Sequence, residues 1–248
     1  MSEHAVSGAI PLRAVIFDLF HTLVDMRHAP PETSTSHVLG IPQEIWNQKV
    51  MEESPHHALG TEVDPVESVR KIAHAIDPTI PMERILAAVE SRPVRFRAAL
   101  VQVSPAILEM VGRLRELGLK TGLISNAGLD EIAYWPESPL APLFDTALFS
   151  CQEKLMKPDP QIYLRAAQNL GVPAEACLFV GDGGSREHAG ARGAGMHTVL
   201  LLSILNEIYP ELAASRTRDT DWVAESLAEF ERLVERLVSE GLPLKAPG

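Results

Sequence analysis

Short apolar runs rich in β-branched residues recur along the chain, and helical patterns separate the later ones. Runs of this kind are typical of buried parallel strands. The expected strands cover Arg13–Asp18, Leu119–Ser125, Asp145–Ser150, Ala176–Asp182 and His197–Leu202. Strands that alternate with helices form βαβ units, so the pattern predicts an α/β fold with a doubly wound, Rossmann-like parallel sheet.

Helix start and stop signals delimit the segments between these strands. Ser104-Pro105 is a favourable N-cap and first-turn pair, apolar residues follow at helical spacing, and Gly118 ends the pattern. Further helices are expected at Pro160–Leu170 and Arg186–Ala194. The apolar face of residues 227–238 predicts a C-terminal helix that covers the core.

The stretch from Met26 to Leu100 contains no convincing strand. Pro30–Ser36 has the composition of a loop, as have residues 1–10 and 129–143. We expect a helical cap domain at 26–100, inserted into a core domain made of 1–25 and 101–248, where it lies over the carboxyl ends of the strands. Its expected helices are Pro42–Glu53, Pro65–Ile76 and Pro81–Leu100.

Composition and charge restrict the possible partners. The 248 residues are 46% hydrophobic and 22% charged, with a net charge of −11. A repelling surface argues against nucleic acid and against an anionic membrane, whereas a small anionic substrate can still bind where cations gather. Two cysteines suggest a reducing compartment and hence the cytoplasm. No apolar run approaches membrane-spanning length, the N-terminus lacks the apolar region of a signal peptide, and nothing indicates an oligomeric state.

Polar side chains follow four of the apolar runs, at the points where strands should end. Asp18 follows the first run, Ser125-Asn126 ends the second, Lys157 lies in Lys157-Pro158-Asp159-Pro160, and Asp182 lies in Gly181-Asp182-Gly183-Gly184. In doubly wound sheets ligands bind outside the carboxyl ends of the strands, so these side chains form a candidate site. A carboxylate can act as a nucleophile if a cation and hydrogen-bond donors already stabilise the negative charge that its attack creates.

The order and spacing of these four elements resemble those of the haloacid dehalogenase-like (HAD) superfamily of hydrolases, in the branch with a helical cap between the first and second motifs. The resemblance covers almost the whole chain. It implies that Asp18 is the nucleophile and that Ser125 and the backbone N–H of Asn126 hold the transferring group. It also implies that Lys157 neutralises Asp18 together with the incoming anion.

The same resemblance implies a Mg²⁺ site formed by Asp18, the backbone carbonyl of Phe20 and Asp182. Hard oxygen ligands completed by water suit this ion. Thr22 is expected to fix the loop after the first strand by hydrogen bonding, at the edge of the substrate site. Glu187 occupies a position where relatives usually have Asp, and it is interpreted either as a residue of the metal's water shell or as an ordinary acid in the first turn of a helix.

The resemblance fails at two positions after the nucleophile. Phosphatases of the family carry a second Asp where this chain has Phe20, and they carry a small Gly where it has His21. An unactivated alkoxide needs a proton as it leaves, and general acid catalysis is worth about 10²–10⁴-fold. His21 or a cap residue would have to supply that proton. Otherwise the chemistry suits leaving groups that depart unaided.

Three functions remain open from the sequence. The first is hydrolysis of a small phosphorylated metabolite by Asp18 and Mg²⁺. The second is hydrolysis at carbon, as in the 2-haloacid dehalogenases, which lack the second Asp but need no metal and have a fourth motif without Gly-Asp. The third is a catalytically weakened binding protein. Four arginines of the predicted cap could contact an anion, although solvated helix faces are the favoured interpretation: Arg70, Arg92, Arg95 and Arg97.

Overall fold

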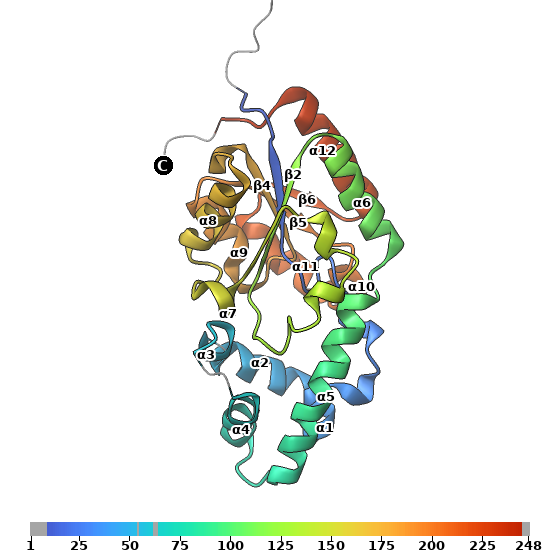
Figure 1. Ribbon diagram of the computed structural model, residues 1–248, viewed down its shortest axis with the longest axis vertical. Helices are drawn as coiled ribbons and strands as arrows, with labels where there is room; N and C mark the ends of the chain where they lie inside the picture. Colours follow the sequence, from blue (N-terminus) through green and yellow to red (C-terminus); the bar gives the residue numbers. More distant parts are fainter. Residues whose placement is uncertain (1–8, 54, 62–63, 245–248) are drawn as a thin grey trace, which may run out of the picture.

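Six parallel strands form the centre of the molecule, in the order β3-β2-β1-β4-β5-β6 (Figure 1). The structure is a computed structural model, and it describes residues 9–53, 55–61 and 64–244. The strands are β1 (Ala14–Phe17), β2 (Lys120–Ser125), β3 (Thr146–Phe149), β4 (Cys177–Gly181), β5 (His197–Leu201) and β6 (Trp222–Ala224). Five of them lie within the expected runs. Sequence reasoning missed β6 because this edge strand has only three residues, Trp222–Ala224, and is only partly buried.

Helices cover both faces of this sheet, which confirms the predicted α/β architecture. α6 (Pro105–Glu116) and α12 (Leu227–Glu240) lie on one face, and α8 (Pro160–Leu170) and α9 (Glu187–Gly193) lie on the other (Figure 1). Side chains alternate accordingly along β1. Val15 and Phe17 belong to the hydrophobic cluster under the first pair of helices, whereas Ala14 and Ile16 belong to the cluster under the second pair.

The predicted boundaries of these helices are close to the observed ones, although the caps differ in detail. The Ser104 side chain accepts no capping hydrogen bond, so the start of α6 depends on Pro105 alone. Asp159 caps α8 by accepting a hydrogen bond from the backbone of Gln161, and α9 begins one residue later than expected.

The segment between β1 and α6 is helical in its described residues. Its elements are η1 (Met26–His28), η2 (Pro31–Thr33), α1 (Thr35–Leu39), α2 (Gln43–Glu53), α3 (Pro55–Ala58), α4 (Pro65–Ile76) and α5 (Met82–Val101). The expectation of a loop at Pro30–Ser36 is wrong, because η2 and the start of α1 occupy these residues. The Ser34 hydroxyl accepts a capping hydrogen bond from the backbone N–H of His37. The three longer helices were predicted.

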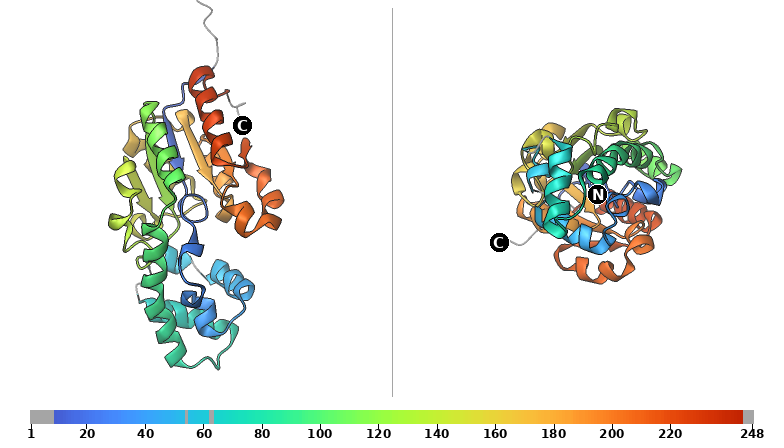
Figure 2. Two further views of the ribbon diagram at one scale, coloured as in Figure 1. Left: turned by 90° about the vertical axis from the view of Figure 1, so that its right-hand side faces the viewer. Right: turned by 90° about the horizontal axis from the view of Figure 1, so that it is seen from below.

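This helical block has a small hydrophobic cluster of its own, and α5 connects it to the main core. Leu39, Trp46 and Ile85 belong to the small cluster, whereas Ala99 and Leu100 at the other end of α5 belong to the cluster against the sheet. Figure 2 shows α5 running from the block to the level of the sheet. None of the helices in the described part of the chain combines the length and apolar character needed to cross a bilayer.

The remaining connections are short helical turns and irregular segments. Residues 1–8 of the expected flexible lead-in lie outside the described residues, but Ile10 forms an antiparallel bridge with Leu242, so at that position the expectation is wrong. Residues 129–143 are mostly irregular, as predicted, and Trp135 packs against Phe149. The short elements are η3 (Trp135–Glu137), η4 (Ala141–Leu143), α7 (Ser150–Glu153), η5 (Ala174–Ala176), η6 (Gly184–Arg186), α10 (Leu205–Ile208), α11 (Pro210–Arg216) and η7 (Thr217–Asp219).

The carboxyl ends of the strands face the helical block (Figures 1 and 2). Because β1 lies between β2 and β4, the chain crosses from one half of the sheet to the other beside the end of β1. Such a switch point is where doubly wound sheets bind ligands. Asp18 directly follows β1, Ser125 ends β2, and Asp182 directly follows β4.

Candidate active site

Three buried carboxylates meet at the end of β1. Carboxylate oxygens of Asp18, Asp182 and Glu187 all lie within 4.8 Å of one another. The backbone N–H of Asp18 donates to the carbonyl of Val180 at 2.8 Å, which extends the ladder between β1 and β4 by one residue and fixes where the Asp18 side chain starts. Two residues predicted to be close, Asp18 and Asp182, are therefore brought together by the sheet itself.

Lys157 lies between two of these carboxylates. Its ammonium donates to Oδ1 of Asp18 at 2.5 Å and to Oε2 of Glu187 at 2.6 Å, and its side chain is only 3% exposed. Burial by itself would lower the pKa of Lys157, but the charges of Asp18 and Glu187 outweigh this effect and raise it. Lys157 is therefore a buried, positioned cation and not a solvated surface lysine.

Asn126 holds the backbone of Lys157 in place. Its amide oxygen accepts a hydrogen bond from the Lys157 N–H at 2.8 Å, and its amide nitrogen donates to the Lys157 carbonyl at 2.9 Å. This reciprocal pair ties the end of β2 to the loop that carries the ammonium. The sequence suggested a role only for the backbone of Asn126, so the function of its side chain was missed.

The hydroxyls of Thr22 and Ser125 differ in their surroundings. Thr22 donates to Oδ2 of Asp18 at 2.8 Å, in the loop where a hydrogen-bonding threonine was expected. Ser125 is 1% exposed, and within the described ranges its hydroxyl makes no hydrogen bond. A buried hydroxyl without a partner is available to a bound group.

Glu187 is an integral member of the cluster. Its Oε1 accepts a hydrogen bond from the backbone of Gly183 at 2.8 Å, while its Oε2 accepts from Lys157. Burial raises the pKa of Glu187, and the nearby Asp18 and Asp182 add to this effect although Lys157 opposes it. A Cβ at Gly181 would lie 2.1 Å from Oε1 of Glu187, so the glycine that ends β4 makes room for this carboxylate.

Arg216 is the residue of this site that sequence reasoning missed entirely. From the end of α11 its Nη1 donates to Oδ2 of Asp182 at 2.5 Å and to the Asp182 carbonyl at 3.0 Å. Gly184 adds a backbone hydrogen bond to the other oxygen of Asp182. Thirty-four positions separate Arg216 from Asp182, and no motif marks it, so only tertiary structure reveals the pair.

Phe20 and His21 form the turn beside the carboxylates. The Phe20 ring contacts the Phe96 ring of α5 edge to face, with ring centres 5.8 Å apart. His21 has a φ of 66°, an unusual backbone conformation for a non-glycine residue that costs about 1–3 kcal/mol. The Nδ1 atom of His21 is buried without a hydrogen-bond partner among the residues described.

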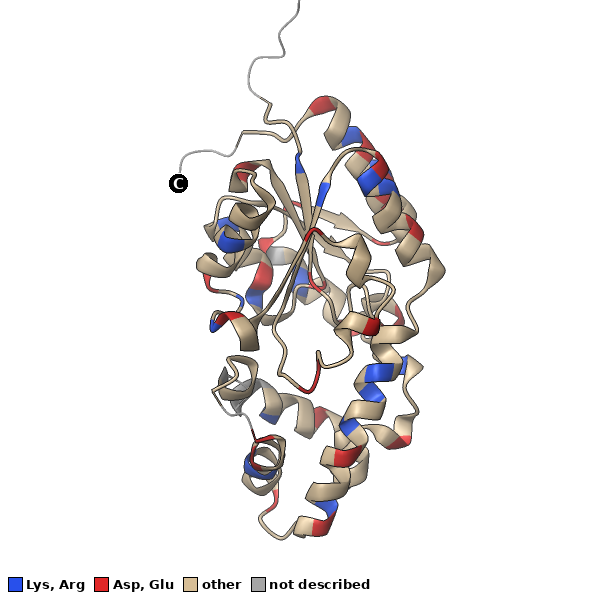
Figure 3. Cartoon of the chain, viewed as in Figure 1, with Lys and Arg blue, Asp and Glu red and all other residues tan. Residues whose placement is uncertain are grey.

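The four arginines of the helical block divide into two groups. Three of them form ion pairs: Arg70 with Glu67, Arg92 with Asp130 and Glu131, and Arg97 with Glu137. The expectation of a solvated face is wrong for Arg92, which is buried. Arg95 is half-buried and, in the part of the chain that the structure describes, has no ion pair or hydrogen bond. Figure 3 shows several basic positions along α5.

The oxygen-rich cluster fits the Mg²⁺ ion that the resemblance implies. Its donors are carboxylates, which this ion prefers, and all three are buried, two directly after strands and Glu187 at the start of α9. The carbonyl oxygen of Phe20 accepts no hydrogen bond from the described residues, so this atom too is available. Arg216 competes for one oxygen of Asp182, a feature that the sequence did not suggest.

The fold and this cluster define an α/β enzyme with acid and lysine side chains at the switch point of its sheet. A family model described as haloacid dehalogenase-like hydrolase matches residues 12–195. The chain therefore belongs to this family of hydrolases, as the motifs predicted.

Relatives of known activity include both chemistries considered above. The chain is 24% identical to a glyceraldehyde 3-phosphate phosphatase of Methanopyrus kandleri, over 76% of this chain and 83% of the relative. It is 26% identical to (S)-2-haloacid dehalogenase 4A of Burkholderia cepacia, over 84% of this chain and 97% of the relative. The structure of an L-2-haloacid dehalogenase from Xanthobacter autotrophicus matches with a TM-score of 0.65 at 22% identity, covering 90% of this chain and 98% of that one, which shows a shared fold.

Proposed function

We propose that this hydrolase transfers a phosphoryl group from a small phosphorylated metabolite to Asp18 and then to water, with the help of Mg²⁺. One observation carries the proposal: three buried carboxylates lie within 4.8 Å of one another, and they outnumber the two cations that pair with them, Lys157 and Arg216. Such an excess of buried acid is costly unless a cation shares it. Displacement at carbon would require no such cluster.

In this proposal the protein positions the reacting groups before the substrate arrives. Thr22 and Lys157 each bind one oxygen of Asp18, and they thereby orient the carboxylate for attack. The free hydroxyl of Ser125 and the backbone N–H of Asn126 hold the transferring group. Lys157, fixed by the Asn126 side chain, stabilises the negative charge that develops.

Asp18, Asp182 and the Phe20 carbonyl would hold the metal ion, and Glu187 would bind its water shell. When bound, Mg²⁺ neutralises the oxygens of the transferring group. Residues 26–100 act as a cap that shields the reacting groups from water, while the core domain consists of 1–25 and 101–248. The cytoplasmic location expected from the two cysteines, both free and buried, is part of the proposal.

Phe20 restricts the range of substrates. Its ring occupies the position from which the second Asp would protonate a leaving alkoxide, and it packs against Phe96 without any acidic group. We therefore expect leaving groups that need no proton, such as phosphoanhydrides and aryl phosphates, to react much faster than alkyl esters.

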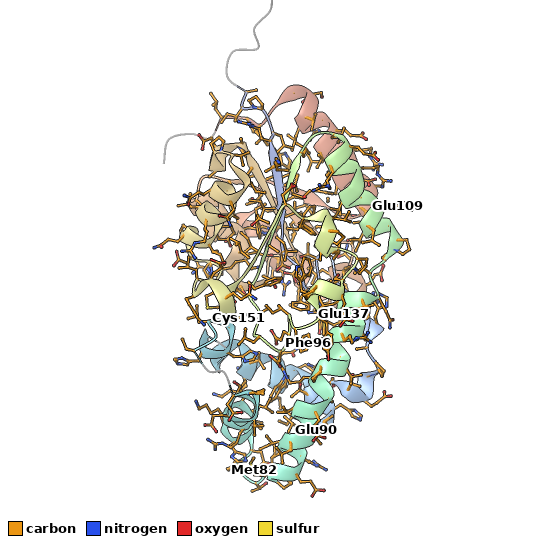
Figure 4. All side chains as sticks on the ribbon, in the orientation of Figure 1. Met82, Glu90, Phe96, Glu109, Glu137 and Cys151 are labelled. Atoms are coloured by element: carbon orange, nitrogen blue, oxygen red, sulfur yellow. The ribbon has the colours of Figure 1, made fainter. Side chains whose placement is uncertain are left out.

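Asp18→Asn tests the nucleophile, because an amide of the same shape cannot attack phosphorus. We expect phosphate release from an aryl phosphate to require Mg²⁺ and to disappear in this variant. Glu109→Gln is the matched control, since Glu109 lies on the exposed face of α6 (Figure 4) and should leave activity unchanged. Full activity of Asp18→Asn, or full activity in excess chelator, would contradict the proposal.

Hydrolysis at carbon is the second candidate, and two observations favour it. Arg216 already neutralises Asp182, and the aromatic contact of Phe20 with Phe96 offers an apolar wall beside the nucleophile. Release of chloride from 2-chloropropanoate in excess chelator, abolished by Asp18→Asn, would establish this reaction. Phosphate release that depends on Mg²⁺, with no chloride release, would exclude it.

A further inference from the structure

Arg95 of α5 is a basic residue whose guanidinium has no protein partner among the described residues. Its guanidinium is half-buried and, over the ranges that the structure describes, it has neither an ion pair nor a hydrogen bond. Arg92 and Arg97 lie on the same helix and are both paired with carboxylates. A partly desolvated guanidinium without a partner is unfavourable, and an anion that binds beside it removes the penalty.

His21 and Tyr209 are two further polar residues whose side-chain donors are unused among the described residues. Burial lowers the pKa of the Arg95 guanidinium, and Tyr209 opposes part of this effect. The Tyr209 ring contacts the His21 ring, with centres 6.1 Å apart. Neither the Tyr209 hydroxyl nor the buried Nδ1 of His21 has a hydrogen-bond partner within the described part of the chain.

We propose that Arg95, His21 and Tyr209 form a subsite for a second oxyanion of the substrate, a carboxylate or phosphate at the end remote from the bond that breaks. The inference rests on the proposed function, because it takes Asp18 as the point of attack. A guanidinium fork, an imidazole and a phenol offer donors in different directions, which suits a group with several acceptor oxygens.

The position of the subsite relative to Asp18 supports this assignment. His21 is three residues after Asp18 in the same turn, and its positive φ holds it there. Phe96, adjacent to Arg95, contacts Phe20 in that turn, and Figure 4 labels it on the part of α5 between the helical block and the sheet.

An ion pair fixes the third member of the subsite against the same turn. Arg27, which follows the turn, donates to Glu207 at 2.7 Å, and Glu207 lies two residues before Tyr209. The three donors therefore come from three elements that meet beside the nucleophile. None of the three donors pairs with the carboxylate cluster among the described residues, so a substrate that engaged both places would carry an anionic group at each end.

Binding of unreactive analogues tests the subsite without requiring turnover. Propylphosphonate, 3-phosphonopropanoate and propane-1,3-diphosphonate share one end and differ at the other, and calorimetry with Mg²⁺ gives their affinities. We expect the two analogues with a second anion to bind roughly 10- to 100-fold more tightly than propylphosphonate, the range typical of charge-assisted hydrogen bonds. The better of the two identifies whether a carboxylate or a phosphate is preferred.

Variants assign that preference to the subsite. Arg95→Gln should remove it, Arg95→Lys should keep part of it, and Tyr209→Phe, which loses only a hydroxyl, should reduce it about threefold to tenfold. Arg97→Gln is the matched control on the same helix and should retain the full preference. His21→Asn preserves a residue that tolerates positive φ and should weaken the preference without unfolding the turn.

A second pair of ligands separates failure of the subsite from failure of the proposed function. Pentanedioate and pentanoate differ by one carboxylate and contain no phosphorus. If phosphonates fail to bind but pentanedioate binds more tightly than pentanoate in an Arg95-dependent manner, the subsite stands and phosphoryl chemistry is wrong. If neither pair shows a preference that Arg95→Gln abolishes, or if Arg97→Gln abolishes it equally, the subsite is wrong.

Discussion

A largely buried group of four charges joins the helical block to the core and makes the stability of the protein depend on pH. His57 in α3 and Arg92 in α5 face Asp130 and Glu131, which follow β2. Nε2 of His57 lies 3.2 Å from Oδ1 of Asp130, close enough for charge attraction although the ring N–H is not aligned with that oxygen. A Cβ at Gly128 would lie 2.0 Å from the same nitrogen, so the imidazole packs directly on the core backbone.

The carboxylates hold this imidazole in its charged form. Burial alone would lower the pKa of His57, but Asp130 and Glu131 overcome burial and raise it to about 9. A rise from 6.5 to about 9 corresponds to roughly 3 kcal/mol of stability. Because the folded pKa lies above the unfolded one, this contribution is complete below pH 6.5 and is lost as the pH rises through 9.

His57→Gln tests this contribution, because glutamine keeps the polar character of the side chain but cannot carry a charge. We expect it to lower the free energy of unfolding by roughly 3 kcal/mol at pH 6 and by much less at pH 10. Urea denaturation followed by circular dichroism and by tryptophan fluorescence gives this free energy at each pH. His37→Gln, at an exposed position in α1, is the matched control and should be nearly neutral at both pH values.

If the free energies of unfolding of wild type and His57→Gln differ by the same amount from pH 6 to pH 10, the charge of His57 does not stabilise the protein. The imidazole would then contribute by packing rather than by its charge. If His57→Gln lowers the free energy of unfolding more at pH 10 than at pH 6, the predicted direction of the pH dependence is wrong.

Three other predictions concern the active site and its support. Phe20→Asp should raise kcat/KM for an alkyl phosphate relative to an aryl phosphate by about 10²-fold, because the new carboxyl can donate a proton to the leaving group. An unchanged ratio would show that Phe20 does not limit the hydrolysis of alkyl esters. Arg216→Gln should increase Mg²⁺ affinity about tenfold or more in calorimetry, since a cation no longer competes at Asp182, and weaker binding would contradict that competition. Gly190→Ala should lower the free energy of unfolding by about 1–3 kcal/mol, because the new Cβ would lie 2.4 Å from the carbonyl oxygen of Pro158, next to Lys157. The control Gly112→Ala meets no atom within 4 Å and should raise the free energy of unfolding by about 1 kcal/mol. Equal effects of the two variants in urea denaturation would exclude the steric explanation.

Much of the fold follows from local pattern. Strands that are buried on both faces leave continuous apolar runs, and helices such as α8 begin and end at recognisable caps, so both were predicted nearly to the residue. β6 and α1 escaped prediction because their short, mixed sequences take their structure from neighbours. The proximity of Asp18 to Asp182 followed from the rule that the carboxyl ends of parallel strands meet.

Charge pairs between distant segments could not be predicted in the same way. Arg216 with Asp182, and His57 with Asp130, join elements whose relative positions depend on the whole fold. Nothing in the sequence distinguishes the arginines of α5 from one another. In the structure, Arg92 and Arg97 form ion pairs with carboxylates, whereas Arg95 has no partner among the residues described. Glu187 was recognised from its position in the family pattern, and the structure adds that Gly181 leaves the space that its carboxylate fills.

The balance of charge at the site separates the two candidate chemistries. Three carboxylates, those of Asp18, Asp182 and Glu187, face two cations, Lys157 and Arg216. The three carboxylates carry one more charge than the two cations, and burial, which raises the pKa of Glu187, reduces this excess without reversing it. A phosphate dianion adds more negative charge to the site than a haloacid monoanion does, so Mg²⁺ should strengthen phosphonate binding strongly, whereas binding of a monoanionic haloacid should respond much less. The ratio of these two responses therefore reports which substrate the charges of this site are arranged to receive.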